Sequence, residues 1–226
     1  MGEKPLGVGN NLQKNIMKAF IINFNRLTYL RDMVTWCLEH NLEPVIIDNA
    51  SDYAPLLEYY HSKPCEIIQM PQNYGHTVMW HGLIKLPKER FIITDPDLDM
   101  SGVPDDFLKM MNLGLDCYPW AAKCGLSLEI DDLPEGLERE YVHRIESVFW
   151  QYPLDSLFFK ADTDTTFALY RETTREHTHI AIRINRPYTA RHYSWYYTDF
   201  NLLPEDEQNY YLTANSSASG KDRLMK

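Results

Sequence analysis

The stretch FIITDPDLD, residues 91–99, places an apolar run directly before three aspartates at alternate positions. The apolar run predicts a short buried strand that ends where Asp95, Asp97 and Asp99 begin. Side chains two residues apart in an extended chain point to the same side, so these carboxylates would gather three negative charges in one small volume. The cluster therefore needs something that offsets its repulsion.

Three more strand candidates precede this stretch, and they alternate with helix candidates. The strands are AFIINF (19–24), PVIID (44–48) and CEIIQM (65–70). Apolar residues at helical spacing after the first strand predict one helix, and residues 49–62 predict a second, capped by Ser51 or Asp52. Residues 73–86 predict a loop that enters a third helix. Strand and helix thus alternate four times, which predicts a parallel sheet covered on both faces.

The second half of the chain is less regular. Pro104 and the two acids after it are typical of the first turn of a helix. Segments 120–130, 165–170 and 179–184 predict strands, and an apolar helical spacing runs through residues 137–148. We expect this half to extend the sheet with mixed strand pairing.

Length and composition predict one domain over residues 16–212. A chain of 226 residues without an internal linker is typical of a single domain, and the pattern of elements makes its class α/β. The sheet would be Rossmann-like, mostly parallel and flanked by helices, with mixed strands in the C-terminal half. Residues 1–15 and 213–226 are polar and rich in small side chains, which predicts flexible tails.

The composition also restricts the partners. With 32 acidic and 22 basic side chains the formal net charge is −10, which disfavours a nucleic-acid polymer because phosphate contacts need a basic surface. The four cysteines lack the short spacings of a zinc site or a disulfide framework and predict reduced thiols. The sequence shows neither a leader peptide nor an apolar stretch long enough to span a membrane, so we expect a cytoplasmic protein without a membrane span.

Polar residues follow each strand of the predicted parallel sheet. Such sheets bind ligands in the crevice outside the carboxyl ends of their strands. The expected strand ends carry, in order, Asn25 and Arg26, Asp48 and Asn49, Asn73, and Asp95 to Asp99. The sequence therefore predicts a binding site at this edge of the sheet.

Four interpretations of the aspartate cluster compete. A turn at Asp-Pro with solvated carboxylates is common after a strand. A calcium loop of the EF-hand type would need glycine where Met100 stands and glutamate where Asp106 stands. A phosphatase of the haloacid-dehalogenase type would carry its Asp-x-Asp after the first strand, whereas here three strands come before. A carboxylate pair that holds Mg²⁺ or Mn²⁺ against a diphosphate would explain how an acidic protein binds an anion.

Four segments in order, NFNR, PVIIDNASD, PQNYGH and FIITDPDLD, resemble the nucleotide-binding half of glycosyltransferases of the A-type fold, closest to family two. The resemblance covers residues 18–106 and extends more weakly to His192. It implies a nucleotide-binding half at 16–106 and an acceptor-side half at 107–212. It also implies transfer of a sugar from a nucleoside-diphosphate sugar, most often UDP-linked, to a hydroxyl of a glycan or another acceptor.

The resemblance gives each matching position in the first three segments a role in binding the donor. Asp48 would accept a hydrogen bond from the nucleotide base, and Asn49 would shape the turn beside it. Arg26 would lie near the nucleotide. Asn73 would shape the loop before the next helix.

The remaining matches imply a metal and a leaving-group site. Asp95 would reach the ribose or a metal-bound water, and Asp97 would bind Mn²⁺ or Mg²⁺, with Asp99 as a supporting residue. Many transferases of this fold bring a late histidine back to the metal, and His192 follows a predicted strand where such a ligand belongs. Arg191 beside it would neutralise the departing diphosphate.

The catalytic base is where the chain departs from the family. An inverting transferase needs a carboxylate that takes the proton of the acceptor hydroxyl, and the acidic pair frequent in family two is missing here. Acids near predicted strand ends are Asp131, Asp132, Asp162 and Asp164. We expect Asp132 or Asp164 to be the base, and the inverting outcome follows from the resemblance alone.

Two other functions remain open. A sugar-phosphate nucleotidyltransferase would share the fold and the metal, but it needs a glycine-rich basic loop after the first strand, and NFNRLTYL lacks one. A carbohydrate-binding protein without catalysis would leave the metal motif and the basic segment unused.

Overall fold

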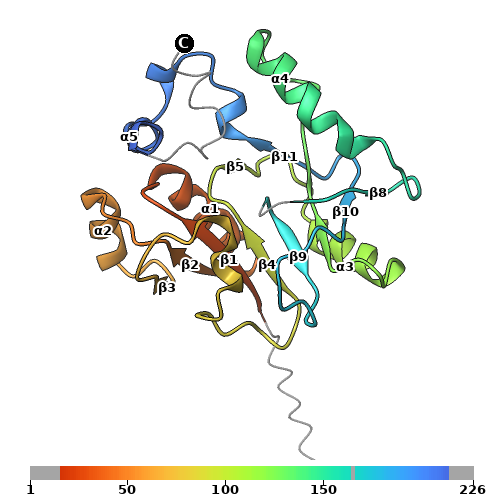
Figure 1. Ribbon diagram of the computed structural model, residues 1–226, viewed down its shortest axis with the longest axis horizontal. Coiled ribbons are helices and arrows are strands. Elements are labelled where there is room, and N and C mark those ends of the chain that lie inside the picture. The colour runs from red at the N-terminus through yellow and green to blue at the C-terminus, as the bar shows by residue number, and fades with distance from the viewer. Residues whose placement is uncertain (1–15, 164–165, 214–226) are drawn as a thin grey trace, which may run out of the picture.

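The computed structural model describes residues 16–163 and 166–213, and within them the chain forms an eight-stranded sheet, a three-stranded sheet and five α-helices (Figure 1). The strand order in the large sheet is β3-β2-β1-β4-β9-β6-β10-β8. Residues 1–15, 214–226 and Asp164 lie outside the described residues, so the expected tails and one expected base stay predictions. Cys37 and Cys124 are buried, and all four cysteines are unpaired, as expected.

The first half of the chain forms the parallel part of the sheet. Its elements are β1 (Met17–Asn23), α1 (Thr28–Glu39), β2 (Leu42–Asp48), α2 (Ala54–His61), β3 (Glu66–Gln69) and β4 (Phe91–Thr94). β1 lies between β2 and β4 and is parallel to both, and β2 is parallel to β3. The predicted parallel pairing of these four strands is confirmed, and their carboxyl ends share one edge of the sheet.

Both faces of this sheet are buried, as its apolar strands require. Along β1, Ala19 and Ile21 belong to the same core cluster as the buried side of α1. Phe20 and Ile22 point the other way, into a second cluster that the 3₁₀ helix η1 (Gly75–Trp80) covers. Alternating side chains of one strand thus hold two different layers against the sheet.

The prediction of a third helix is wrong, because residues 73–86 contain only η1 within a loop. Gly75 and Gly82 adopt the left-handed φ values of 64° and 75°, which interrupt a regular α-helix on either side of this turn. The loop still closes the second face of the sheet, because Val78 and Met79 are buried in it.

The expected cap of α2 is also wrong. The helix starts at Ala54, with Tyr53 at the capping position and no side-chain cap. Ser51 Oγ instead accepts a hydrogen bond from the backbone N–H of Asn25 at 2.9 Å, and Asp52 Oδ1 accepts one from Asn25 Nδ2 at 2.7 Å. These side chains join the loops after β1 and β2, a long-range use that a local capping pattern does not reveal.

The second half extends the sheet with mixed pairing, as expected. Its main elements are α3 (Phe107–Cys117), β6 (Lys123–Gly125), α4 (Leu137–Glu146), β8 (Phe158–Lys160), β9 (Ala168–Tyr170) and β10 (Ala181–Ile184). β9 runs antiparallel to both β4 and β6, β10 is parallel to β6, and β8 is antiparallel to β10. The described residues therefore form one α/β domain around a large mixed sheet.

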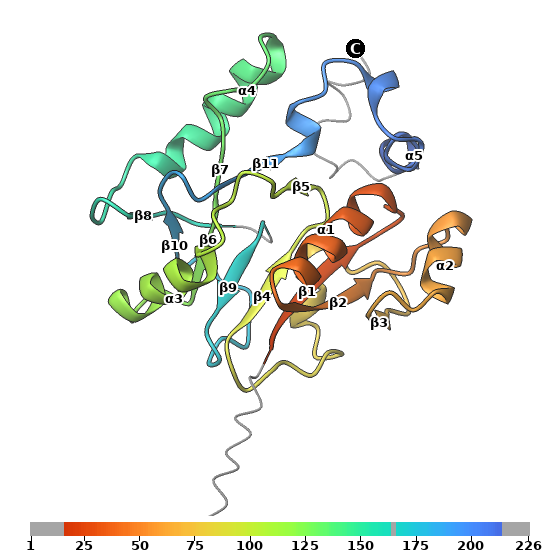
Figure 2. The same cartoon turned by 180° about the vertical axis from the view of Figure 1, so that it is seen from behind.

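A small sheet lies beyond the carboxyl end of β4, between α4 and the C-terminal helix α5 (Glu205–Thr213) (Figures 1 and 2). It consists of β5 (Leu98–Asp99), β7 (Ser127–Leu128) and β11 (Thr189–His192), with β11 in the middle. Three short 3₁₀ helices complete the second half: η2 (Ser147–Trp150), η3 (Tyr193–Trp195) and η4 (Phe200–Leu202). The pairing of β5 with β11 sets His192 opposite Leu98, so the late histidine segment lies against the aspartate segment.

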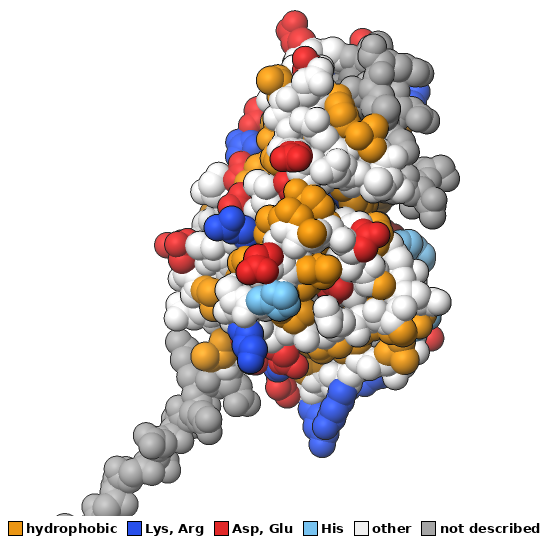
Figure 3. Space-filling view, turned by 90° about the vertical axis from the view of Figure 1, so that its left-hand side faces the viewer, with side chains coloured by type: hydrophobic (Ala, Val, Ile, Leu, Met, Phe, Trp, Pro, Cys, Tyr) orange, Lys and Arg blue, Asp and Glu red, His pale blue; other side chains and the backbone are white. Residues whose placement is uncertain are grey.

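On the face seen in Figure 3, Lys and Arg side chains lie apart from one another among acidic and apolar side chains. This face accords with the acidic net charge of −10. No helix in the described part of the chain is long and apolar enough to cross a bilayer.

Candidate functional site

Asp97 is the most constrained member of the aspartate cluster. Its side chain is buried, and its Oδ2 lies 2.6 Å from Nη1 of Arg26, which follows β1 and is buried as well. Burial opposes ionisation of Asp97, but the charge of Arg26, aided by His192, outweighs it, so the pKa of Asp97 lies below its usual value. Arg26 thus offsets part of the repulsion among the clustered aspartates.

The other two aspartates have different surroundings. Asp95 is half-buried and lines a cavity described below. Asp99, in β5, accepts a hydrogen bond from the backbone N–H of Ser101 at 2.9 Å and so holds its own turn. This agrees with a supporting position for Asp99.

His192 comes back to the aspartates, as expected for a late histidine. Its Nε2 lies 3.4 Å from Oδ2 of Asp97. The ring stacks on Trp195 with centroids 5.1 Å apart, and Ser194 Oγ lies 2.9 Å from Nδ1. Packing and a polar contact therefore fix the imidazole beside the carboxylate.

The C-terminal helix adds a residue that sequence analysis missed. Glu207 Oε2 lies 3.3 Å from Nε of Arg26, and the same guanidinium lies 4.0 Å from the ring centre of Tyr210. Burial raises the pKa of Glu207 to about 8, although Arg26 lowers it. Glu207 stands in the polar segment PEDEQNYY, and nothing in that segment predicts that its side chain is buried beside Arg26.

Asp48, expected to bind the nucleotide base, and Asn49, expected to shape the turn beside it, make hydrogen bonds within the protein. Asp48 accepts one from the Tyr60 hydroxyl at 3.1 Å and one from the Ser51 N–H at 3.2 Å. Asn49 Nδ2 donates to the carbonyl of Gly75 at 3.1 Å. Their contacts join the ends of β2 and η1 at the carboxyl edge of the sheet.

Asn73 lies in the same loop and is exposed. Its Oδ1 accepts a hydrogen bond from the N–H of Gly75 at 2.8 Å, which shapes the turn into η1. The contact lies within the loop, and the donor-binding role expected for Asn73 stays a prediction.

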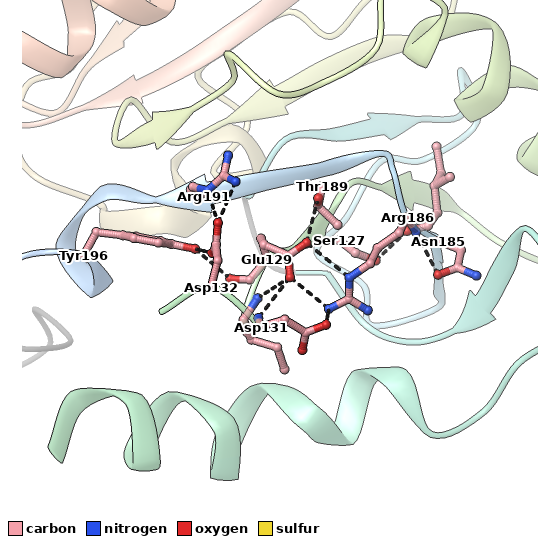
Figure 4. A network of polar contacts seen from close by, with 11 residues as sticks. Ser127, Glu129, Asp131, Asp132, Asn185, Arg186, Thr189, Arg191 and Tyr196 are labelled. Carbon is pink, nitrogen blue, oxygen red and sulfur yellow. Dashed lines mark hydrogen bonds and ion pairs between the residues drawn. The ribbon is translucent and has the colours of Figure 1, made fainter. Parts of the chain in front are cut away.

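Asp132 and Arg191 pair with each other (Figure 4). Arg191 Nε and Nη2 lie 2.8 and 2.6 Å from Asp132 Oδ2, and the Tyr196 hydroxyl donates to Oδ1 at 2.6 Å. Burial raises the pKa of Asp132, but the hydrogen bonds of Tyr196 and Arg191 lower it by more than burial raises it. The pKa of Asp132 therefore lies below its usual value. A carboxylate with both oxygens occupied is a weak proton acceptor, and Arg191 has less freedom to contact a diphosphate.

A similar pair lies next to this one. Arg186 Nη2 lies 2.9 Å from Glu129 Oε1, and together with Thr189 these residues join β11 to the turn after β7 (Figure 4). The hydrogen bonds and charge of Arg186 lower the pKa of Glu129 to about 2 against the effect of burial. This network fixes the position of β11 and therefore of His192.

A cavity of about 440 Å³ lies beside the aspartates. Asp95, His192 and Trp195 line it, and Asp162, His177 and His179 line it as well. Asp132, Arg191 and Asp97 are not among the described residues that line it. Of the expected site residues, the structure thus brings Asp95 and His192 to the cavity and sets Asp97 directly behind them.

The two histidines at 177 and 179 were not expected at the site. The pattern His-x-His at the start of the strand predicted over 179–184 was a usable signal, because alternate residues of an extended chain share a side. Their rings lie 5.0 Å apart, and His76 from η1 lies 5.8 Å from His177.

The expected cation site fits these residues only in part. Carboxylate oxygens and an imidazole nitrogen suit Mn²⁺. However, the Asp97 oxygen that faces His192 already pairs with Arg26, and in the described part of the chain no three His, Cys, Asp or Glu side chains are grouped to hold a metal ion. In this arrangement, Arg26 supplies the positive charge next to Asp97.

No protein-family model matches this chain, and no curated protein matches it. The class that the fold defines is an α/β protein with a large mixed sheet, whose parallel strands end beside a polar cavity. A functional assignment therefore depends on the geometry of the site.

Proposed function

We propose that this protein transfers a sugar from a nucleoside-diphosphate sugar, UDP-linked by preference, to an acceptor hydroxyl, and that its sheet is of the glycosyltransferase A type. One observation carries the proposal: Asp97 and His192, from distant parts of the sequence, lie 3.4 Å apart at the carboxyl edge of the parallel strands, next to a cavity that Asp95 and His192 line. A ligand bound at these residues would extend from the edge of the sheet into the cavity.

The donor would lie across this edge. Its nucleoside would lie near Asp48, Asn49 and Asn73, and its sugar would enter the cavity, where Asp95 can accept hydrogen bonds from sugar hydroxyls. Imidazole and carboxylate groups on the opposite wall would face the acceptor.

The metal remains a prediction of the resemblance. Asp95, Asp97 and His192 would be the residues that hold it, but Asp97 would have to exchange Arg26 for the cation. The roles of the side chains above do not depend on a metal.

Donor binding tests the proposal directly. Isothermal titration with UDP-sugars, with and without Mn²⁺, should show binding to the wild-type chain and weaker binding to His192→Ala and Asp95→Asn. Asp97→Ala should also weaken binding, but it leaves buried Arg26 without its partner, so its folding must be checked by circular dichroism. His61→Ala, an exposed histidine on α2, is the matched control.

Product analysis separates the competing functions. Release of a nucleoside diphosphate from a nucleotide sugar supports transfer. Release of pyrophosphate from a nucleoside triphosphate and a sugar phosphate would indicate a nucleotidyltransferase instead, and binding of free sugars without turnover would indicate a carbohydrate-binding protein. Unchanged donor affinity in all three site variants would contradict the proposed site.

A further inference from the structure

The cavity has a second polar group on a wall formed by the second half of the chain. His179 Nδ1 lies 2.5 Å from Oδ2 of Asp162, and both side chains line the cavity with Asp95 and His192. The His179 side chain is 75% exposed and that of Asp162 is 33% exposed, so an acceptor molecule can reach the imidazole.

The sheet holds the Asp162 segment in place. The backbone carbonyl of Asp162 accepts a hydrogen bond from Nε of Arg183, in β10, at 2.5 Å. Buried Lys123, in β6, donates to the carbonyl of Thr163, and its Nζ lies 3.6 Å from Oδ1 of Asp162. His179 itself lies two residues before the start of β10. A site supported in this way can keep its geometry during a reaction.

Close packing of the backbone also fixes the position of the Asp162 segment. Gly125 in β6 lies against Thr163, where an added Cβ would come within 2.5 Å of Thr163 Oγ1. Only glycine allows this approach, which sets the segment of Asp162 against the sheet.

The contact determines what the imidazole can do. A carboxylate at Nδ1 favours the tautomer that carries its proton there, so Nε2 keeps a lone pair that can accept a proton. The same carboxylate stabilises the imidazolium ion once the proton has been taken. Histidine held in this way is a general base.

Other acids near the cavity are less suited to this task. Glu146 lines the cavity, but it forms a buried ion pair with Arg183. Asp132 is occupied by Arg191 and Tyr196 and is not among the described residues that line the cavity.

We propose that His179 is the catalytic base of the sugar transfer and that Asp162 is its positioning residue, an inference that rests on the proposed transferase function. The acceptor oxygen forms a bond to the anomeric carbon of the donor, and the bond from that carbon to the phosphate oxygen breaks. The nucleoside diphosphate leaves with the electron pair of that bond, and the proton of the acceptor hydroxyl passes to Nε2 of His179.

The test compares His179→Ala and Asp162→Asn with the wild-type chain. Nucleoside diphosphate release is measured with a panel of UDP-sugars and methyl glycosides as acceptors, and donor affinity is measured by titration. We expect kcat to fall by about 100-fold or more in His179→Ala, with donor affinity almost unchanged. Added imidazole should restore part of the activity of His179→Ala but not that of Asp162→Asn, because only the first variant lacks the imidazole itself.

His61→Ala is the matched control, since His61 also lies near a carboxylate, Glu58 at 3.3 Å, but on the surface of α2. It should keep full activity and should not respond to imidazole. Full activity of His179→Ala would overturn the assignment, and loss in Asp162→Asn alone would make that carboxylate the base. Loss in His179→Ala that imidazole does not restore would also overturn it. If the wild-type chain releases no nucleoside diphosphate from any donor, the transferase function fails first, and this assignment fails with it.

Discussion

At the end of β1, the guanidinium group of Arg26 contacts three residues from two distant parts of the chain. It pairs with Asp97 after β4, approaches Glu207 on α5 and lies over the ring of Tyr210. A buried charge needs such partners, because desolvation costs more than any one of them returns. Arg26 therefore links the aspartate cluster to the C-terminal helix.

Arg26→Gln tests whether this guanidinium occupies the place of a cation. The variant should lose about 3–5 kcal/mol in free energy of unfolding, because Asp97 is left buried without its partner. Mn²⁺ should then raise the melting temperature of the variant more than that of the wild-type chain, since the freed carboxylate lies 3.4 Å from His192. Thermal unfolding with and without Mn²⁺ measures both effects.

Arg31→Gln is the control for this experiment, because Arg31 is exposed on α1. It should change neither the stability nor the response to Mn²⁺. An equal Mn²⁺ response in Arg26→Gln and wild type would show that Arg26 does not keep a cation from Asp97.

Glu207 should make stability depend on pH. Burial raises its pKa to about 8 from an ordinary 4.5. Between these values the unfolded chain releases this proton and the folded chain keeps it, so the stabilisation is complete below the ordinary value and is lost as pH rises towards about 8. Asp97 has a lowered pKa, so its contribution to the free energy of unfolding is lost only as pH falls through that lowered pKa. The titratable and charged groups around Glu207 are Arg26, Tyr29, Asp97, Asp206, Tyr210 and Tyr211.

Glu207→Gln removes the titrating group but keeps the shape of the side chain. In urea unfolding from about pH 5 to about pH 8, the wild-type free energy of unfolding should fall by up to about 1.4 kcal/mol per pH unit, and the variant should show a smaller fall. Glu205→Gln, at an exposed position on the same helix, should behave like wild type. Parallel pH curves for wild type and Glu207→Gln would contradict the buried, protonated state of Glu207.

Among the elements, α5 completes α1. The capping position of α1 is Leu27, which cannot cap through its side chain, and Asp206 from α5 takes this role. Its Oδ2 accepts from the N–H groups of Leu27 at 2.6 Å and Thr28 at 2.8 Å, and its Oδ1 accepts from the Thr28 hydroxyl at 2.7 Å. Asp206 lies 179 residues after Leu27, the capping position of the helix that it stabilises.

Asp206→Ala should destabilise the protein by about 2 kcal/mol, the upper part of the range for loss of a helix cap, because the cap is buried and accepts several hydrogen bonds. Urea unfolding measures the change, with Glu205→Ala as an exposed control next to it. If Asp206→Ala is as stable as this control, α5 does not cap α1 in solution.

For the whole molecule, the two expected halves share one core. β4 pairs with β9 along the middle of the large sheet, and the rings of Phe91 and Tyr170 stack with centroids 5.6 Å apart. Both residues belong to the core cluster on one face of the sheet. The segments 16–106 and 107–212 therefore share one core, and we expect them to unfold as one cooperative unit.

A fragment of residues 16–106 tests this unity. On its own it should show no cooperative thermal transition, because β4 loses β9 and the shared core is cut open. Co-expression with residues 107–213 should restore a cooperative transition and near-UV circular dichroism. A sharp transition in the isolated fragment would show that the first half folds by itself.

Local patterns predicted the elements better than the contacts between them. The strands and helices of the first half follow from apolar runs and from helical spacing, which a few neighbouring residues determine. The cap expected at Ser51 or Asp52 was wrong because both side chains contact Asn25 in another loop. The helix expected over 73–86 was wrong because two glycines with positive φ limit it to η1.

The sequence alone determined the α/β class, the parallel order of the first half and the gathering of polar residues at one edge of the sheet, because these depend on periodicities within short segments. Only the tertiary structure decided that Arg26 pairs with Asp97, that Asp132 pairs with Arg191, and that Asp162 and His179 pair at the wall of the cavity. The physical reason is that a buried charge takes whichever partner the packed chain brings within hydrogen-bond distance. That partner can come from any part of the sequence, so no local pattern records it.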